Sequence, residues 1–397
     1  MNSYQTSKWE WVALEDAVEI CDYLRKPVNS KERAQRVANK REDELYPYYG
    51  ATGQVGYIDS YLSDGEYVLL GEDGAPFLDP FAKKAYLIKG KGWVNNHAHV
   101  LKSKLNNKFL CYYLNQVDYN GLVTGTTRYK LTQAAMKRIL VPTPDLVEQE
   151  RIVSKIEELF SKLDASVAEL KTAKEKLKVY RQAVLKEAFR NVGKKVFLKS
   201  LFCGTPQNGL YKSKAAYGKG IRILRIDGFY DGFVNSEYEY KRLSLSREEI
   251  EKYSLNQFDL VINRVNSMPY LGKCALIRHI DETTVFESNI MRVRLNLDVV
   301  SPEYVTYFLA SDDGRRELTK NAKQAVNQAS INQTDVGDAL VPLPEDRALQ
   351  EQTVAIIEQN LSVCDSIESS INISLQQAKA LRQSILKQAF EGILLRR

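Results

Sequence analysis

A duplicated segment constrains the fold of this chain more than any other feature. Residues 181–189 read RQAVLKEAF, and residues 382–390 read RQSILKQAF. Aligned at a constant offset of 201 positions, residues 149–189 and 350–390 share 14 identities in 41 positions. The chain therefore contains two copies of one structural design.

The likeness continues upstream of the duplicated segment at slightly different offsets. Leu140-Val-Pro-Thr-Pro144 matches Leu340-Val-Pro-Leu-Pro344 at an offset of 200, and FLCYYL at 109–114 matches YVTYFL at 304–309 at an offset of 195. Offsets that drift while the order is kept are expected when loops change length between fixed elements. Each copy is therefore predicted to be a variable globular part followed by a shared tail.

The shared tail has the pattern of a long helix. Apolar residues recur at alternating spacings of three and four positions, with charged residues between them, which is typical of a coiled-coil seam. Proline cannot lie inside a helix, so the prolines of the two Leu-Val-Pro motifs place the helix starts just downstream. The predicted seam residues are Ile152, Ile156, Leu159, Leu163, Leu170, Leu177, Val184, Ile357, Ile367, Ile371, Leu381 and Ile385.

A helix with one apolar stripe needs a partner, and the stripe that matches it best is its own duplicate. Two copies of one surface pair most simply about a two-fold axis, which sets the helices antiparallel. Two alternatives are that each helix packs on its own domain, or that the seam recruits other chains. The shared Arg, Gln and Lys residues of the nine-residue repeats are expected to face a partner protein.

The globular parts alternate short β-rich runs with glycine turns, so the fold class is α+β. We expect two mixed α/β domains, two long antiparallel coiled-coil helices and an internal pseudo-two-fold repeat. The expected boundaries are 1–146 for the first domain, 147–191 for the central helix, 192–346 for the second domain and 347–397 for the C-terminal helix. The expected strand runs are 57–58, 67–70, 85–88 and 97–100 in the first copy, and 221–224, 259–262, 274–277 and 291–295 in the second.

Composition narrows the class of protein. No apolar run approaches the ~18 residues that a membrane helix needs, and the start MNSYQTSKWEW lacks a basic patch followed by an apolar stretch. We therefore expect a cytoplasmic protein with no membrane partner. Five scattered cysteines without a CxxC pair argue against a disulfide framework or a zinc ribbon, and the net charge of +6 permits a polyanionic partner.

Motifs for catalysis are weak. Gly50-Ala-Thr-Gly53 and Gly71-Glu-Asp-Gly74 lack the Lys-Ser/Thr of a phosphate-binding loop and are expected to be turns. His97 and His99 alternate on a predicted strand, but no third ligand follows at a usual spacing, so no metal site is expected. The chain also lacks a GxSxG nucleophile motif.

The loops are instead rich in side chains that suit DNA. Arg pairs with guanine, Asn and Gln pair with adenine, and Lys and Thr suit phosphates. The candidate DNA-binding residues are Tyr48, Tyr49, Asn95, Asn96, Thr126, Thr127, Arg128 and Lys130 in the first copy, and Asn208, Arg264, Asn266, Asn289, Gln324, Asn327 and Gln328 in the second.

Several motifs, taken in order, resemble one known family over essentially the whole chain: the specificity (S) subunits of type I restriction-modification systems. The motifs are Tyr46-Pro-Tyr-Tyr-Gly-Ala-Thr-Gly53, Leu69-Leu-Gly-Glu-Asp-Gly-Ala75, Val94-Asn-Asn-His-Ala-His-Val100, Leu140-Val-Pro-Thr-Pro144 with Glu148-Gln149, Cys203-Gly-Thr-Pro206, Asn327-Gln-Ala-Ser-Ile-Asn332 and Leu340-Val-Pro-Leu-Pro344. In the second copy, a one-residue insertion precedes the helix.

The resemblance implies a DNA-specificity subunit that is not itself an enzyme. It implies two target-recognition domains that each read one half of an asymmetric bipartite sequence in double-stranded DNA. It also implies helices that set the spacing and dock two methyltransferase subunits, with restriction/translocase subunits joining the larger complex. S-adenosylmethionine is expected in the partner methyltransferase, and no cofactor is expected in this chain.

Two other classes of function compete with this interpretation. A self-sufficient methyltransferase or nuclease would need an active-site constellation that the sequence lacks, since Asp79-Pro80-Phe81 has no second proline and no cofactor-binding glycine motif accompanies it. A coiled-coil scaffold would use the globular parts to bind protein rather than DNA.

Overall fold

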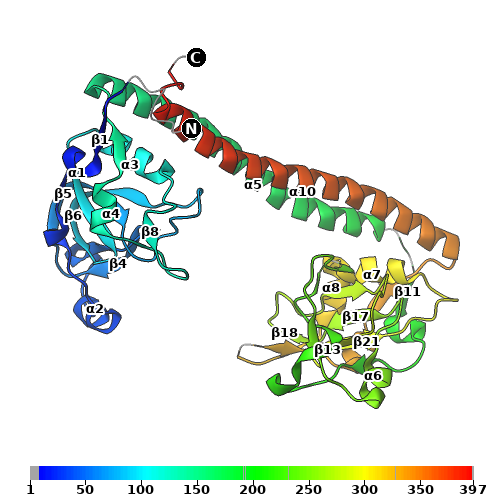
Figure 1. Cartoon of the computed structure of the whole chain (residues 1–397). Helices are drawn as coiled ribbons and strands as arrows, with labels where there is room; N and C mark the ends of the chain where they lie inside the picture. The colour runs from blue at the N-terminus through cyan, green and yellow to red at the C-terminus, as the bar shows by residue number, and fades with distance from the viewer. Residues whose placement is uncertain (1–8, 191, 193, 231, 327, 396–397) are drawn as a thin grey trace. The chain divides into compact units, whose positions relative to one another are not determined.

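The chain folds into two compact units that each combine a sheet-rich domain with half of each long helix. The computed structural model describes residues 9–190, 192, 194–230, 232–326 and 328–395. Unit 1 comprises Met1–Thr172 with Ile371–Arg397, and unit 2 comprises Ala173–Ser370. The long helices are α5 (Leu146–Ala188) and α10 (Arg347–Phe390) (Figure 1). Within the described ranges, no helix is both long and apolar enough to cross a membrane.

The domain of unit 1 is built on a six-stranded sheet in the order β2-β7-β5-β6-β3-β4. Its longest ladder is antiparallel and runs from Ser63↔Gly92 to Leu70↔Ala85. Helix α3 buries Phe109 and Leu114 in the same core as Val68 and Leu70 of the sheet. The elements are β1 (Trp11–Ala13), α1 (Leu14–Ala17), β2 (Val18–Ile20), α2 (Ser30–Val37), β3 (Tyr46–Tyr49), β4 (Gln54–Ile58), β5 (Ser63–Gly71), β6 (Ala85–Val94), β7 (Ala98–Ser103), α3 (Asn107–Gln116), β8 (Val123–Thr124), β9 (Lys130–Leu131), α4 (Gln133–Lys137) and β10 (Leu140–Pro142).

The domain of unit 2 repeats the six-stranded sheet of unit 1, with only the last two strands exchanged in order. One sheet has the order β12-β21-β17-β19-β15-β14, and two three-stranded sheets have the orders β16-β13-β20 and β18-β23-β22. Helix α7 covers the larger sheet in the way that α3 does in unit 1. The elements are β11 (Lys195–Phe197), β12 (Gln207–Asn208), β13 (Tyr217–Leu224), β14 (Phe229–Tyr230), β15 (Gly232–Val234), β16 (Lys241–Leu243), α6 (Arg247–Tyr253), β17 (Leu260–Asn263), β18 (Val265–Asn266), β19 (Cys274–Leu276), β20 (Thr284–Phe286), β21 (Ile290–Val293), α7 (Pro302–Ala310), α8 (Asp312–Thr319), β22 (Lys323–Gln324), β23 (Ala329–Ser330), α9 (Gln333–Gly337) and β24 (Leu340–Pro342).

The predicted α+β class is confirmed, and each predicted strand run falls wholly or mostly within a strand. The Leu-Val-Pro motifs form equivalent strands that pair with the first strand of each domain. In unit 1, β10 pairs antiparallel with β1, and in unit 2, β24 pairs antiparallel with β11. The long helices begin four and five residues after these strands, as the prolines predict.

The last residue of α10 anchors it to the domain of unit 1. Phe390 packs edge-on against Phe109 and Tyr113 of α3, with both ring centroids 5.2 Å away. Ile385 and Leu386 are buried in the same core, beside Ile152 and other residues from the start of α5.

The end of α5 makes the equivalent contact in unit 2. Phe189 follows the last residue of α5 and packs edge-on against Tyr304 and Phe308 of α7, with ring centroids 5.1 and 5.3 Å away. Leu185 and Ile357 are buried in the same core. Each domain therefore receives the start of one long helix and the end of the other.

The two helices run antiparallel, as predicted. In unit 2, Lys174 of α5 lies 3.4 Å from Glu368 of α10. Arg181, about two turns later, lies 3.1 Å from Glu368 and 2.7 Å from Asp365, which precedes it on α10. As residue numbers increase along α5, the numbers of the residues that they contact on α10 decrease. Exposed ion pairs of this kind contribute little stability and act mainly on register.

The same ion pair recurs in unit 1 between the equivalent residues. Arg382 lies 2.7 Å from Asp164, and its guanidinium lies 4.0 Å from the ring centroid of Phe160. The expectation that the shared arginines face only a partner protein is therefore wrong, because both close the helix pair. Gln182 is also used internally, since its side chain hydrogen bonds with the backbone around the start of α8.

The predicted seam is partly confirmed by burial. Ile152, Ile156, Leu177, Ile357, Ile371 and Ile385 are buried, and Leu159, Leu163, Leu170 and Val184 are half-buried. Ile367 and Leu381 are corrections to the predicted seam, since 45% and 50% of their surface is exposed. A straight helix has 3.6 residues per turn, so a seam drawn at 3.5 drifts off the buried face.

A carboxylate and a histidine lock the sheet of unit 1 to the segment after β2. Asp22 Oδ2 lies 2.8 Å from Nδ1 of the buried His99, and Asp22 Oδ1 accepts a 2.9 Å hydrogen bond from the Val100 amide. Burial alone would raise the pKa of Asp22, but the His99 and Val100 hydrogen bonds and nearby Arg25 outweigh it, so this pKa lies below its ordinary value.

We predict that Phe390→Ala lowers the free energy of unfolding of unit 1 by about 3–5 kcal/mol, because it leaves a cavity between two buried rings. Phe189→Ala should cost unit 2 a similar amount. Chemical denaturation of the full chain measures both. Phe81→Ala is the matched control, since Phe81 is exposed. An equal, small effect of all three substitutions would contradict the anchoring role.

We also predict that Asp22→Asn flattens the pH dependence of unfolding. A carboxyl whose folded pKa is depressed stabilises the protein above its ordinary pKa of ~3.9, and this contribution is lost as pH falls through the folded value. The variant should lose about 1–3 kcal/mol at pH 7 and change less than the wild type between pH 5 and 3. Asp43→Asn, at an exposed pair with Arg41, serves as control. An unchanged pH profile would rule out this role.

Candidate nucleic-acid interface

Two short hairpins at equivalent sequence positions present polar side chains to solvent. In unit 1, β8 pairs with β9, and in unit 2, β22 pairs with β23. Val123 aligns with Lys323 and Leu131 with Ile331, each at an offset of 200. Each hairpin is followed by an N-capped helix, α4 or α9.

The tip of the first hairpin depends on a glycine. Gly125 has a φ of +94°, and a Cβ there would lie 2.4 Å from the Arg128 carbonyl oxygen. This tight turn leaves Thr126, Thr127, Arg128 and Lys130 exposed, so these four candidate residues lie together.

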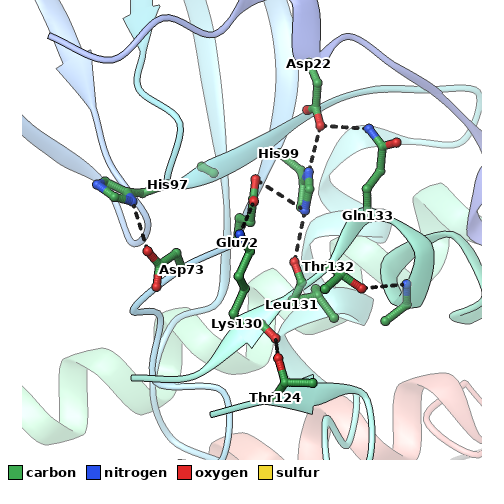
Figure 2. Close-up of polar contacts among 12 residues, drawn as sticks. Asp22, Glu72, Asp73, His97, His99, Thr124, Lys130, Leu131, Thr132 and Gln133 are labelled. Atoms are coloured by element: carbon green, nitrogen blue, oxygen red, sulfur yellow. Dashed lines mark hydrogen bonds and ion pairs between the residues drawn. The ribbon is translucent and has the colours of Figure 1, made fainter. Parts of the chain in front are cut away.

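The first hairpin is joined to the end of β5 through backbone and side chains. Leu131 N donates to the Glu72 carbonyl at 2.7 Å, and Gly74 N donates to the Tyr129 carbonyl at 3.0 Å. Lys130 Nζ lies 3.4 Å from a Glu72 carboxylate oxygen. Figure 2 shows Lys130, Glu72, His99, Asp22 and Gln133 linked in this region.

Asp73 holds the arginine of the hairpin. Arg128 Nε lies 2.7 Å from Asp73 Oδ1. Asp73 Oδ2 lies 3.6 Å from His97 Nδ1 (Figure 2). Sequence reasoning missed Glu72 and Asp73 because it assigned Gly71–Gly74 only as a turn. The sequence signal for this ion pair was two acidic residues between Gly71 and Gly74, together with two basic residues, Arg128 and Lys130, in a predicted loop.

The second hairpin is extended by a third strand. β18 pairs with β23, so Asn266 lies opposite Ala329, and the Arg264 carbonyl accepts a 2.9 Å hydrogen bond from Ile331 N. The Asn289 carbonyl in turn accepts the Arg264 amide at 2.8 Å. The structure thus groups Arg264, Asn266 and Asn289 beside the hairpin that carries Gln324 and Gln328.

The Arg264 side chain is partly committed to the fold. Its Nη1 donates to the Ser288 carbonyl at 3.1 Å, and the side chain is half-buried. Asn266 Oδ1 accepts from Ser267 N at 2.8 Å, which fixes the turn that follows β18. Asn327 lies outside the described residues.

Two candidate residues are corrected by their burial. Tyr48 is 2% exposed, its hydroxyl hydrogen bonds with the Val28 backbone, and it belongs to a small core with Trp93. Asn95 is also buried, and its Oδ1 accepts from His97 N at 2.7 Å, which shapes the turn between β6 and β7. Both side chains therefore stabilise the fold. Residue type alone does not distinguish such buried residues from DNA-binding ones.

Three further candidates are not part of the hairpin strands. Tyr49 is half-buried on β3 and packs near Tyr86 with ring centroids 6.1 Å apart. Asn96 is exposed in the turn after β6, and Asn208 is exposed on β12. Among the described residues, no group of three or more His, Cys, Asp or Glu side chains could hold a metal ion.

Comparisons with known proteins agree with this layout. Residues 6–176 match the family model described as the type I restriction modification DNA specificity domain. The chain is 30% identical over 313 residues to the type I restriction enzyme EcoKI specificity subunit of Escherichia coli K12, covering 75% of this chain and 65% of that protein. It is 29% identical over 315 residues to the StySPI specificity subunit of Salmonella potsdam, covering 76% of this chain and 65% of that protein. The matched region thus spans slightly less than two thirds of these relatives.

Solved structures support the fold. A chain from a structure on complex assembly and conformational transition of the type I R-M system matches with a TM-score of 0.68 at 18% identity, covering 97% of this chain and 98% of that chain. The HsdS subunit from Thermoanaerobacter tengcongensis matches with a TM-score of 0.50 at 18% identity, covering 97% of each chain. Residues 6–176 are thus a type I restriction modification DNA specificity domain, in a chain that is similar over about three quarters of its length to type I restriction enzyme specificity subunits.

Proposed function

We propose that this chain selects the DNA sequence for a type I restriction-modification complex and is not itself catalytic. Each globular domain would read one half of a bipartite target in double-stranded DNA. The observation that carries this proposal is the pair of hairpins at equivalent positions, with unlike exposed residues, on domains that share their framework. Because the residues at the two hairpin tips differ, the two half-sites that they would read should also differ.

The residues at the two hairpins divide by chemistry. Arginine and the side-chain amides can pair with base edges, whereas lysine and threonine hold the backbone of DNA. The first hairpin offers Arg128 with Thr126, Thr127 and Lys130, and the second offers Gln324 and Gln328 beside Arg264. Base contacts would choose the site, and phosphate contacts would fix its register.

The helices would dock two methyltransferase subunits, which would bind S-adenosylmethionine and flip the target adenine for methylation. Equivalent exposed apolar positions support this part of the proposal. Tyr180 of α5 and Leu381 of α10 are related by the offset of 201 and are 52% and 50% exposed. Two identical subunits need two matching surfaces on one chain. Restriction/translocase subunits would join through the complex.

We predict that exchanging the tip of the second hairpin, residues 325–328, for the GTTR of residues 125–128 changes only one half-site. Base-contacting side chains would change while the supporting strands stay the same. Methylome sequencing of cells that carry the complex with each variant reports both half-sites and the gap between them.

The matched control for this exchange replaces residues 297–299, an exposed turn of the same unit. It should leave the methylated sequence unchanged. An unaltered motif after the tip exchange, or a change in both halves at once, would refute the division of labour between the domains.

We further predict that seven-residue insertions in both helices, after Thr172 and after Ser370, change the accepted spacer and leave the half-sites intact. A heptad keeps the seam in phase and adds about 10 Å to each helix. This corresponds to about three base pairs of DNA. The same sequencing experiment tests it, and a heptad in α5 alone, which unbalances the pair, should abolish methylation. An unchanged spacer in the double insertion would be evidence against a spacing role.

A further inference from the structure

The ion pair between Arg128 and Asp73 differs from an ordinary surface ion pair. Arg128 lies on the hairpin of unit 1 and its side chain is 60% exposed, while the side chain of Asp73, two residues after β5, is 28% exposed. The 2.7 Å contact is made by Nε, at the inner side of the guanidinium. The two terminal nitrogen atoms are not used in this contact, and the side chain as a whole stays accessible.

Asp73 is itself held in place. Its backbone amide and that of Glu72 both point to the His97 carbonyl, at 3.5 and 2.8 Å, and its second carboxylate oxygen lies 3.6 Å from His97 Nδ1. Backbone contacts from the turn before β7 thus fix the main chain at Asp73, and His97 lies beside its carboxylate.

Gly74 provides the space for this arrangement. Its φ is +78°, and a Cβ at this position would lie 3.2 Å from Arg128 Nε. Any other residue would strain the backbone and press on the guanidinium. The guanidinium of Arg128 thus lies between the Asp73 carboxylate and a glycine that leaves it room.

A guanidinium fixed through Nε is suited to one ligand in DNA. Its two terminal nitrogens can donate side by side to O6 and N7 of guanine, which is the commonest specific contact in the major groove. Holding the fork in advance reduces the entropy lost on binding. A carboxylate at 2.7 Å would repel a phosphate, so the surroundings of Arg128 favour a base edge over the DNA backbone.

We propose that Arg128 reads a guanine in the half-site of the first domain and that Asp73 is the positioning residue that aims it. This inference rests on the proposed function and deepens it. The residue that aligns with Arg128 at the offset of 200 is Gln328, whose amide suits adenine. The two hairpins therefore read different bases from equivalent positions.

The neighbouring pair of Lys130 and Glu72 provides an internal contrast. Glu72 is also paired with Arg25 and lies 3.8 Å from His99, so this carboxylate belongs to the network that supports the sheet. Lysine has a compact head group without a planar fork. Lys130 is therefore assigned to phosphate contact, and its loss should weaken binding equally on all sequences.

The test compares the complex of the full chain with its methyltransferase subunits, carrying either wild-type chain or Arg128→Lys, Asp73→Asn or Gly74→Ala. Competition binding with every single-base variant of the wild-type target measures discrimination at each position. Arg128→Lys should lose about 10- to 100-fold of discrimination at one G·C pair of the first half-site. Asp73→Asn and Gly74→Ala should lose part of it at the same pair.

A phosphate role for Arg128 gives a different pattern. Binding would then fall equally on all sequences in Arg128→Ala, and Asp73→Asn would raise affinity everywhere without altering discrimination. Either result overturns the inference, as would a first half-site without any G·C pair. Glu19→Gln, at an exposed pair with Lys102 on β2 and β7, is the matched control for loss of one negative charge.

The inference and the proposed function fail in distinguishable ways. If the wild-type complex methylates no bipartite sequence, the proposed function fails. If it does, and Arg128→Lys keeps full discrimination while thermal melting shows a folded chain, only the inference about Arg128 fails.

Discussion

The rest of the structure depends on the burial of one phenylalanine at the end of each shared helical repeat. Phe390 packs between two rings of α3, and Phe189 packs between two rings of α7. Each long helix begins against one domain and ends against the other. Removing either helix would therefore expose the cores of both domains. The near-identity of RQAVLKEAF and RQSILKQAF follows from this constraint: the arginine closes the helix pair and the phenylalanine closes the domain.

A buried glutamine joins the first residues of each long helix to the domain that precedes that helix. Gln149 Oε1 accepts from Asn106 N at 2.8 Å, and Gln350 Oε1 accepts from Ser301 N at 2.9 Å. Both glutamines also donate to the second proline carbonyl of the preceding motif. An unpaired buried amide costs about 1–3 kcal/mol, so these positions tolerate few substitutes. The start of each helix is therefore fixed as firmly to its domain as the end of the other.

The local features of this fold could be predicted from the sequence, and the long-range ones could not. Strand runs, helix starts after the prolines and antiparallel pairing all depend on patterns within one segment or its duplicate. The burial of Tyr48 depends on Val28 and Trp93, and the exposure of Leu381 depends on helix geometry over many turns. At the candidate interface, the exposed tip residues were found from their chemistry, whereas Asp73 was missed because its role arises from a contact with a residue 55 positions away.

The exposed hairpin tips also bear on how such a chain can change over generations. Thr126, Thr127 and Gln328 have no large share in any core, so replacing them costs little folding energy. Substitutions on a solvent-facing tip usually alter stability by less than about 0.5 kcal/mol. New specificities can thus be sampled without first acquiring compensating mutations. Substitutions are therefore restricted at the buried positions of the helices and tolerated at the hairpin tips.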